Sequence, residues 1–177
     1  IFFSSEEVFE IVPDIITCAK GITSGYMPLG AVLFSDKLLN DIKKESALFF
    51  HGYTYSGHPA CCAAALKNIE IIKRDKILEH VQEIEPYFHN KLQKLYELPI
   101  VGDVRGKGLM AGIECVINKD SKEALILDKA IGSRIDEESI KLGLIIRPLY
   151  HICVLSPALI ITKSQIDDLV EKLFTAI

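Results

Sequence analysis

The sequence lacks the features of membrane, secreted and nucleic-acid-binding proteins. No apolar run reaches the roughly 18 to 20 residues that cross a bilayer. Residues 1–12 carry three glutamates and no basic segment, unlike a signal peptide. The 20 Lys and Arg residues are outnumbered by 24 Asp and Glu, whereas a general nucleic-acid binder presents a basic face. We therefore expect a cytoplasmic protein without a membrane or nucleic-acid partner.

The cysteines lack the pattern of a disulfide framework or a zinc site. Their number is five, their spacing is scattered, and no CxxC pair occurs. Cys61 and Cys62 are adjacent, which is a poor geometry for a bond between them. We interpret all five as small core side chains and expect no bound metal.

The composition is that of a globular protein. The 177 residues are 49% hydrophobic and 25% charged, so the chain can bury a core. This length suits one domain, or one domain and part of another. Because the chain opens on Ile1 and not on methionine, we expect a fragment of a longer protein.

The pattern of apolar residues and chain breakers predicts a mixed α/β chain. Short apolar runs predict a buried strand at residues 14–19 and another at 31–34. Helical spacing predicts helices at 36–44, 60–73, 77–98 and 120–142, the last closed by Gly143, and an ordered loop at 49–59. Further strands are predicted within 101–116 and at 144–147 and 152–155, and a capping box of Thr162 and Gln165 begins the final helix. The N-terminal part has too few strands for a closed sheet, and a smaller α+β unit follows from about residue 80.

Lys20 is the first candidate for chemistry. It ends an apolar strand and is followed by a glycine-containing loop, an unusual place for a charge. Burial there would favour a neutral amine, which can attack an aldehyde. On position alone, an ordinary lysine leaving a strand for solvent fits as well.

The tract around Lys20 favours the chemical interpretation. Residues 13–31 read PDIITCAKGITSGYMPLGA. This tract closely resembles the lysine segment of the class III aminotransferases, which depend on pyridoxal phosphate. The resemblance implies that Lys20 forms the Schiff base with the cofactor and then acts as general acid and base.

A second tract carries Thr54. Residues 51–59 read HGYTYSGHP and resemble the family's loop that reaches across a homodimer. The resemblance implies that the Thr54 hydroxyl binds the cofactor phosphate of the neighbouring subunit, as a hydroxyl near backbone amides can. A threonine that stabilises a turn is the alternative, and we interpret Ser56 and His58 as structural.

Two further tracts resemble the family's small domain. Residues 104–114 read VRGKGLMAGIE, where we expect Arg105 to form a structural ion pair. Residues 143–148 read GLIIRP, and the resemblance implies that Arg147 receives a substrate carboxylate through two parallel hydrogen bonds. A surface or structural arginine is the alternative. Pro157 is followed by Ala158, where the family usually has a second proline.

The resemblance also implies what this chain does not hold. The family's phosphate-binding turn, its ring-stacking aromatic residue and the aspartate that pairs with the pyridine nitrogen lie upstream of residues 2–10. Asp14 is not that aspartate, because it follows Pro13 and precedes the strand.

Taken together, the resemblance implies the fold type I of pyridoxal-phosphate enzymes. Residues 1–80 would be the C-terminal part of the large cofactor-binding domain, and residues 81–177 the small α+β domain. The implied reaction moves an amino group from an amine or amino acid to a keto acid or aldehyde. Two alternatives are a truncated, non-catalytic fragment and a class III mutase or decarboxylase.

Overall fold

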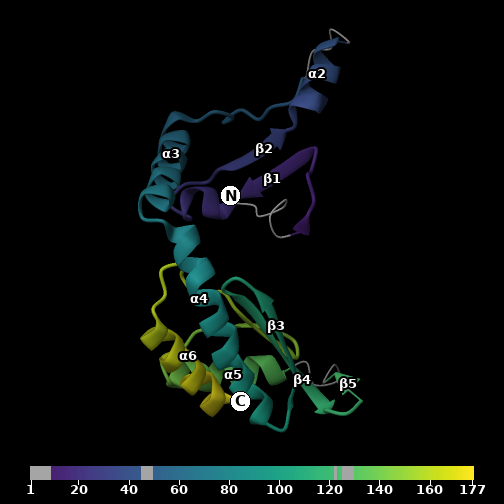
Figure 1. Cartoon of the computed structure of the whole chain (residues 1–177), viewed down its shortest axis with the longest axis vertical. Helices are drawn as coiled ribbons and strands as arrows, with labels where there is room; N and C mark the ends of the chain where they lie inside the picture. The colour runs from purple at the N-terminus through teal and green to yellow at the C-terminus, as the bar shows by residue number, and fades with distance from the viewer. Residues whose placement is uncertain (1–8, 45–49, 122, 125–129) are drawn as a thin grey trace. The chain divides into compact units, whose positions relative to one another are not determined.

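The computed structural model describes residues 9–44, 50–121, 123–124 and 130–177. The chain divides into two compact units, Ile1–Leu78 and Glu79–Ile177 (Figure 1). Residues 2–8, expected to precede the first strand, lie outside the described residues, as does Phe49 of the expected loop. None of the described helices is both long and apolar enough to span a membrane.

The N-terminal unit contains a two-stranded antiparallel sheet. β1 (Ile15–Ala19) pairs with β2 (Gly30–Phe34), and Ala19 lies opposite Gly30 at the end nearest the connection. That connection begins with the 3₁₀ helix η1 (Lys20–Thr23). Both strands were predicted from the sequence.

The prediction that the first strand is buried is wrong. Ile15 is 49% exposed and Val32 on β2 is 54% exposed. The physical reason is the small size of the sheet. It has only two strands among the described residues, and the described part of this unit covers its faces only in part.

Two helices complete the described part of this unit. α2 (Asp36–Lys44) has the predicted bounds, and the Ser35 hydroxyl accepts a hydrogen bond from the Leu38 amide at its start. α3 (Pro59–Arg74) begins with a proline, which is favoured in a first turn because its missing N–H costs no helical hydrogen bond. The buried residues of α3 are Cys61, Ala65 and Ile72.

The C-terminal unit packs helices against an antiparallel sheet. The sheet order is β3 (Val101–Lys107), β4 (Met110–Asn118), β7 (Ile152–Leu155) and β6 (Arg147–Leu149), with β5 (Glu123–Ala124) paired to the end of β4. The helices are α4 (Ile77–Leu92), η2 (Gln93–Glu97), α5 (Ile131–Lys141) and α6 (Lys163–Ala176). One core joins them, with Phe88, Leu92, Ile113, Ile166 and Leu173 fully buried.

Two helix boundaries in this unit differ from the predictions. The helix expected over 77–98 is an α-helix only to Leu92, and its last turn is the 3₁₀ helix η2. The helix expected over 120–142 is confirmed only as α5, since Glu123–Ala124 forms a strand and residues 122 and 125–129 lie outside the described residues.

The strand expected at 144–147 lies later, at Arg147–Leu149. Pro148 was expected to stand outside the strand, because proline cannot donate to a ladder. It is tolerated because β6 is the edge of the β3-β4-β7-β6 order, where one side of the strand needs no partner.

The predicted helix ends are confirmed. Gly143 has φ of 79° after α5, its amide bonds to the Ile140 carbonyl, and the Leu144 amide bonds to the Ser139 carbonyl. These are the two bonds of a Schellman motif. Thr162 and Gln165 form the full capping box at the start of α6.

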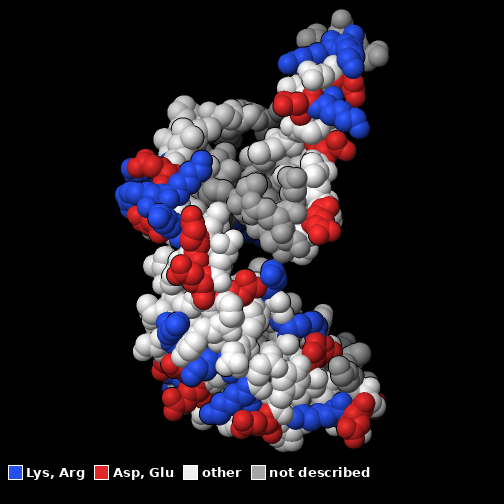
Figure 2. Space-filling view, viewed as in Figure 1, with Lys and Arg blue, Asp and Glu red and all other residues white. Residues whose placement is uncertain are grey.

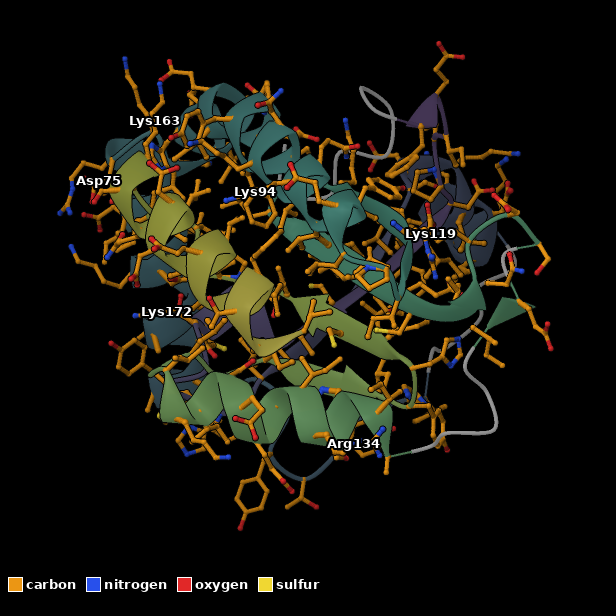
Figure 3. The ribbon with its side chains drawn as sticks, turned by 90° about the horizontal axis from the view of Figure 1, so that it is seen from below. Asp75, Lys94, Lys119, Arg134, Lys163 and Lys172 are labelled. Carbon is orange, nitrogen blue, oxygen red and sulfur yellow. The ribbon has the colours of Figure 1, made fainter. Side chains whose placement is uncertain are left out.

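Charged side chains of both signs are interspersed over the face shown in Figure 2. Lys91 and Asp167 form an exposed ion pair, with 2.8 Å between Nζ and Oδ1. Lys94, labelled in Figure 3, places its ammonium 4.8 Å from the centroid of the Phe174 ring. Exposed ion pairs contribute little to stability, so the buried core carries most of it.

Candidate functional site

Lys20 lies where the sequence predicts, at the end of β1 and the start of η1. Its φ of 52° places it in the left-handed region, which L-residues adopt rarely. Among the described residues, none forms a hydrogen bond or an ion pair with the Lys20 amine. That amine is therefore available to a ligand.

Lys20 is exposed, so the described residues do not bury it. What the structure does fix is the backbone: the Gly25 amide bonds to the Lys20 carbonyl at 3.2 Å, and the Ser24 amide bonds to the Gly21 carbonyl at 3.2 Å. The lysine side chain thus extends from a closed loop.

Thr23 anchors this loop from within. Its side chain is 1% exposed, and its hydroxyl donates to the Met27 carbonyl at 2.6 Å. A buried hydroxyl needs such a partner, because an unpaired one costs its full desolvation energy. Thr23 therefore fixes the path from η1 towards β2.

Asn68 is a residue that sequence reasoning missed. It lies on α3, and its amide nitrogen donates to the carbonyls of Gly21 and Ile22 at 2.9 and 3.1 Å. Its amide oxygen accepts from the Ser24 hydroxyl at 2.7 Å. The available signal was its helical spacing from Ala65 and Ile72, which puts a polar residue on the buried face of α3.

Thr54 lies in the loop before α3, within a turn from Tyr53 to Ser56. The Ser56 amide bonds to the Tyr53 carbonyl at 2.9 Å, and the Ser56 hydroxyl accepts from the Tyr53 amide at 2.9 Å. This turn leaves Thr54 exposed. No hydrogen bond joins Thr54 to Lys20 within the described part of the chain.

The same loop borders a hollow of about 770 Å³ beside the two-stranded sheet. Its lining comes from β1, β2 and the loop, and includes Cys18, Val32, His51 and Tyr53. The rings of His51 and Tyr53 meet edge to face, with centroids 5.6 Å apart. The hollow is mostly apolar with a few polar groups, as ligand sites are, although Lys20 and Thr54 do not line it.

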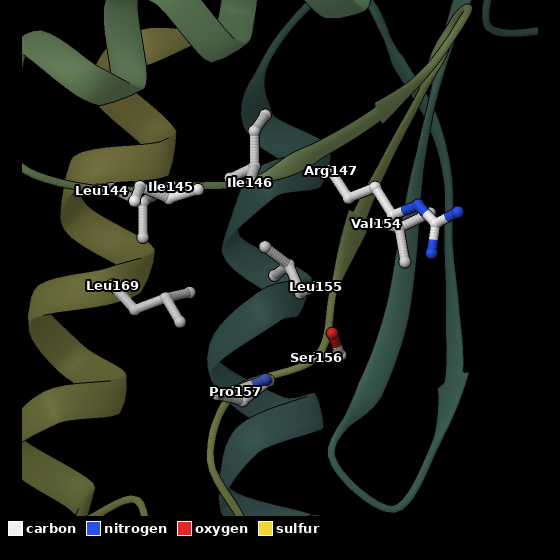
Figure 4. A pocket seen from close by; sticks show the side chains of 9 residues that line it. All are labelled: Leu144, Ile145, Ile146, Arg147, Val154, Leu155, Ser156, Pro157 and Leu169. Atoms are coloured by element: carbon white, nitrogen blue, oxygen red, sulfur yellow. The ribbon is translucent and has the colours of Figure 1, made fainter. Parts of the chain in front are cut away.

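Arg147 belongs to the C-terminal unit, where it pairs with Val154 across β6 and β7. It is exposed and lines a hollow of about 350 Å³ together with Leu144, Leu155 and Ser156. Figure 4 shows its guanidinium directed away from Leu144 and Leu169. No described residue forms an ion pair with it, so its N–H groups are open to a carboxylate.

Arg105 takes the structural place that the sequence predicts. Its Nη1 lies 2.7 Å from Asp103 Oδ2 and 2.5 Å from Glu114 Oε2. The hydrogen bonds that the guanidinium donates to Asp103 and then to Glu114 raise the pKa of Arg105. The ion pair of Arg105 with Glu114 links β3 to β4.

All five cysteines are free. Cys61, Cys115 and Cys153 are buried as expected, whereas Cys18 and Cys62 are only half-buried, so the expectation that all five lie in the core is wrong for these two.

The comparisons with known proteins agree with the family resemblance of the sequence tracts around Lys20, Thr54, Arg105 and Arg147. The sequence model described as aminotransferase class-III matches residues 2–177. A putrescine–pyruvate aminotransferase of Pseudomonas aeruginosa is 42% identical over 159 residues, which are 89% of this chain and 34% of that protein.

Solved transaminases share the architecture. An (S)-enantioselective omega-transaminase from Thermomicrobium roseum matches with a TM-score of 0.90 and 38% identity, covering 97% of this chain and 38% of that one. A PMP-bound aminotransferase from Vibrio fluvialis matches with a TM-score of 0.88 and 35% identity, covering 97% and 38%.

This chain thus spans little more than a third of the length of these relatives. Within that span, its mixed α/β architecture is that of fold type I transaminases, as the sequence predicted. The match extends over nearly all of its residues, so the chain belongs to the class III aminotransferase family.

Proposed function

We propose that the whole protein catalyses transamination with pyridoxal phosphate, and that Lys20 is the residue that binds the cofactor covalently. The observation that carries this proposal is the Lys20 amine, which extends from a hydrogen-bonded loop at the end of β1 and has no hydrogen-bond or ion-pair partner among the described residues. A fixed backbone with a free amine is what reversible attack on an aldehyde requires.

The chain's donors suit the chemical groups of this cofactor. An aldehyde needs an amine, which Lys20 has. A phosphate dianion needs hydrogen-bond donors, and the Thr54 hydroxyl is exposed within its turn. When bound, pyridoxal phosphate supplies an electron sink for the charge left when a proton leaves the substrate α-carbon. We expect Thr54 to act on the cofactor of a neighbouring subunit in a homodimer.

Lys20 has a second role in this proposal. Once its amine is released, Nζ accepts the proton from the α-carbon of the substrate and later returns one. A side chain that takes a proton from one atom and returns one to another must reach both atoms without a rearrangement of its backbone. The hydrogen bonds of the loop that follows Lys20 favour that behaviour.

Arg147 is our proposed carboxylate-binding residue. Its guanidinium is exposed beside the hollow lined by Leu144 and Leu155 and has no acidic partner among the described residues. A guanidinium binds a carboxylate through two parallel hydrogen bonds, which an ammonium cannot reproduce. One substrate is therefore an amino acid or keto acid, while the other is an amine, amino acid or aldehyde.

Three wider assignments belong to the same proposal. Residues 1–80 are the end of the large cofactor-binding domain, and residues 81–177 are the small domain. The whole protein is a cytoplasmic homodimer with shared active sites. The division of the chain after Leu78 supports the domain assignment.

The test is amino transfer by the whole protein, measured as alanine formed from pyruvate with a panel of amine and amino-acid donors. The proposal predicts alanine with at least one donor, and none after Lys20→Ala. Loss of carbon dioxide or internal movement of the amino group, without alanine, would identify a decarboxylase or a mutase. Absence of any turnover would favour the non-catalytic alternative, which the exposed apolar residues of β1 and β2 also fit.

A further inference from the structure

The side chain of Asn68 on α3 makes hydrogen bonds to the loop that follows Lys20. The Asn68 amide nitrogen donates to two consecutive carbonyls, those of Gly21 and Ile22, at 2.9 and 3.1 Å. The amide oxygen accepts from the Ser24 hydroxyl at 2.7 Å. These bonds join residues 44 to 47 positions apart in the sequence, so they fix tertiary and not local structure.

The partners of Asn68 determine how its amide is oriented. Carbonyl oxygens only accept hydrogen bonds, so the nitrogen must face Gly21 and Ile22. The oxygen must then face Ser24, whose hydroxyl can donate. Asparagine meets both demands at once, whereas a carboxylate would turn a negatively charged oxygen towards two carbonyl oxygens.

The position of Asn68 on α3 explains why it reaches the loop. It is half-buried and shares a helix face with the buried residues Cys61, Ala65 and Ile72. The small side chains of Cys61 and Ala65 let α3 lie close against neighbouring backbone. Asn68 is the polar member of this face.

The loop needs an external support. Lys20 and Ser24 have φ of 52° and 50°, and neither is glycine. Such residues persist in the left-handed region only when surrounding structure holds them there. Asn68 bonds to Gly21 and Ile22, two of the three residues between them, and to Ser24 itself.

We propose that Asn68 is a positioning residue for Lys20, acting through the backbone of the loop and not through contact with the cofactor. This inference rests on the proposed function, in which Lys20 bonds to pyridoxal phosphate. Asn68 holds the carbonyls directly after Lys20, and thereby the direction in which the lysine side chain leaves the chain. Its removal should impair formation of the covalent bond more than binding of the rest of the cofactor.

Two forms of the cofactor separate these effects. Pyridoxal phosphate can bond to Lys20, whereas pyridoxamine phosphate carries an amine in place of the aldehyde and cannot. The affinity of the whole protein for each form is measured for the unaltered sequence, Asn68→Asp, Asn68→Ala and Ser24→Ala. Asn40→Asp is the matched control, since Asn40 lies exposed on α2 and its side chain makes no hydrogen bond to described residues.

Asn68→Asp, which loses two hydrogen bonds, and Asn68→Ala, which loses three, should each weaken pyridoxal phosphate binding about tenfold or more. Their affinity for pyridoxamine phosphate should stay within about twofold of the unaltered protein. Ser24→Ala, which removes one hydrogen bond, should have a smaller effect in the same direction. Asn40→Asp should change neither affinity.

Three results would overturn the inference. A parallel loss of affinity for both cofactor forms would mean that Asn68 only maintains the fold. Unchanged affinities in both Asn68 variants would mean that the loop does not depend on it. If the unaltered protein binds pyridoxal phosphate without a bond to Lys20, the proposed function fails and the positioning role fails with it.

Discussion

At Gly106 neighbouring backbone leaves no room for a side chain. This residue lies on β3 opposite Ala111 on β4. A methyl group there would overlap the Met110 carbonyl oxygen and lie 2.9 Å from the Ala111 Cα. It would also lie 2.8 Å from Cε1 of His89, whose ring bonds to the Gly108 carbonyl. Neither backbone nor ring can withdraw without loss of sheet or hydrogen-bond contacts.

Gly106→Ala should therefore destabilise the C-terminal unit by about 2–3 kcal/mol, the upper part of the range for overpacked sites. At an m value of about 2 kcal/mol per molar urea, the unfolding midpoint would fall by about 1 M. Urea unfolding followed by far-ultraviolet circular dichroism measures this change.

Gly112→Ala is the matched control. It lies on β4 of the same hairpin, and its added methyl would be 3.5 Å from Ile152 Cγ2, an ordinary contact. Alanine is favoured over glycine within a strand by roughly 0.5–1 kcal/mol, so this variant should be neutral or slightly more stable. The reasoning is refuted if Gly106→Ala unfolds at the same urea concentration as Gly112→Ala.

Three other predictions concern a helix cap, a carboxylate and the Thr54 turn. Thr162→Ala removes the capping box of α6 and should cost about 1 kcal/mol of unfolding free energy in the same urea assay. Burial, the largest single influence, raises the pKa of Glu85, but the hydrogen bond from the Gly108 amide and the nearby Lys107 ammonium together outweigh it and hold the pKa below its usual value of 4.5. Glu85 therefore stabilises the fold above that pH and loses its effect as the pH falls through its folded pKa, so Glu85→Gln should flatten the acid side of a stability profile. Ser56→Ala removes the hydroxyl that closes the turn around Thr54 and should weaken pyridoxal phosphate binding several-fold in an equilibrium titration. An unchanged affinity for pyridoxal phosphate would contradict the proposal that Thr54 binds the cofactor phosphate.

Local signals were sufficient where a few neighbouring residues decide the structure. The capping box at Thr162 and the helix end at Gly143 were both predicted, because each depends on hydrogen bonds within one turn of a helix. The bounds of α2 followed for the same reason. Long continuous tracts likewise identified the family.

Features that depend on tertiary pairing were not predicted. The shift of β6 to Arg147–Leu149 follows from its place at the sheet edge, which no local pattern reveals. The exposure of β1 depends on how many strands join it. Asn68 was missed because its partners lie more than 40 residues away, although its spacing on α3 was a usable signal.

The central claim is that Lys20 binds the cofactor, and borohydride reduction tests it most directly. The whole protein is mixed with pyridoxal phosphate, its absorbance spectrum is recorded, and the reduced protein is mapped by peptide mass spectrometry. Our account predicts a visible absorbance band and a label on Lys20, both absent from Lys20→Ala. A label fixed on another lysine, or on the Lys20→Ala protein to the same extent, would contradict it.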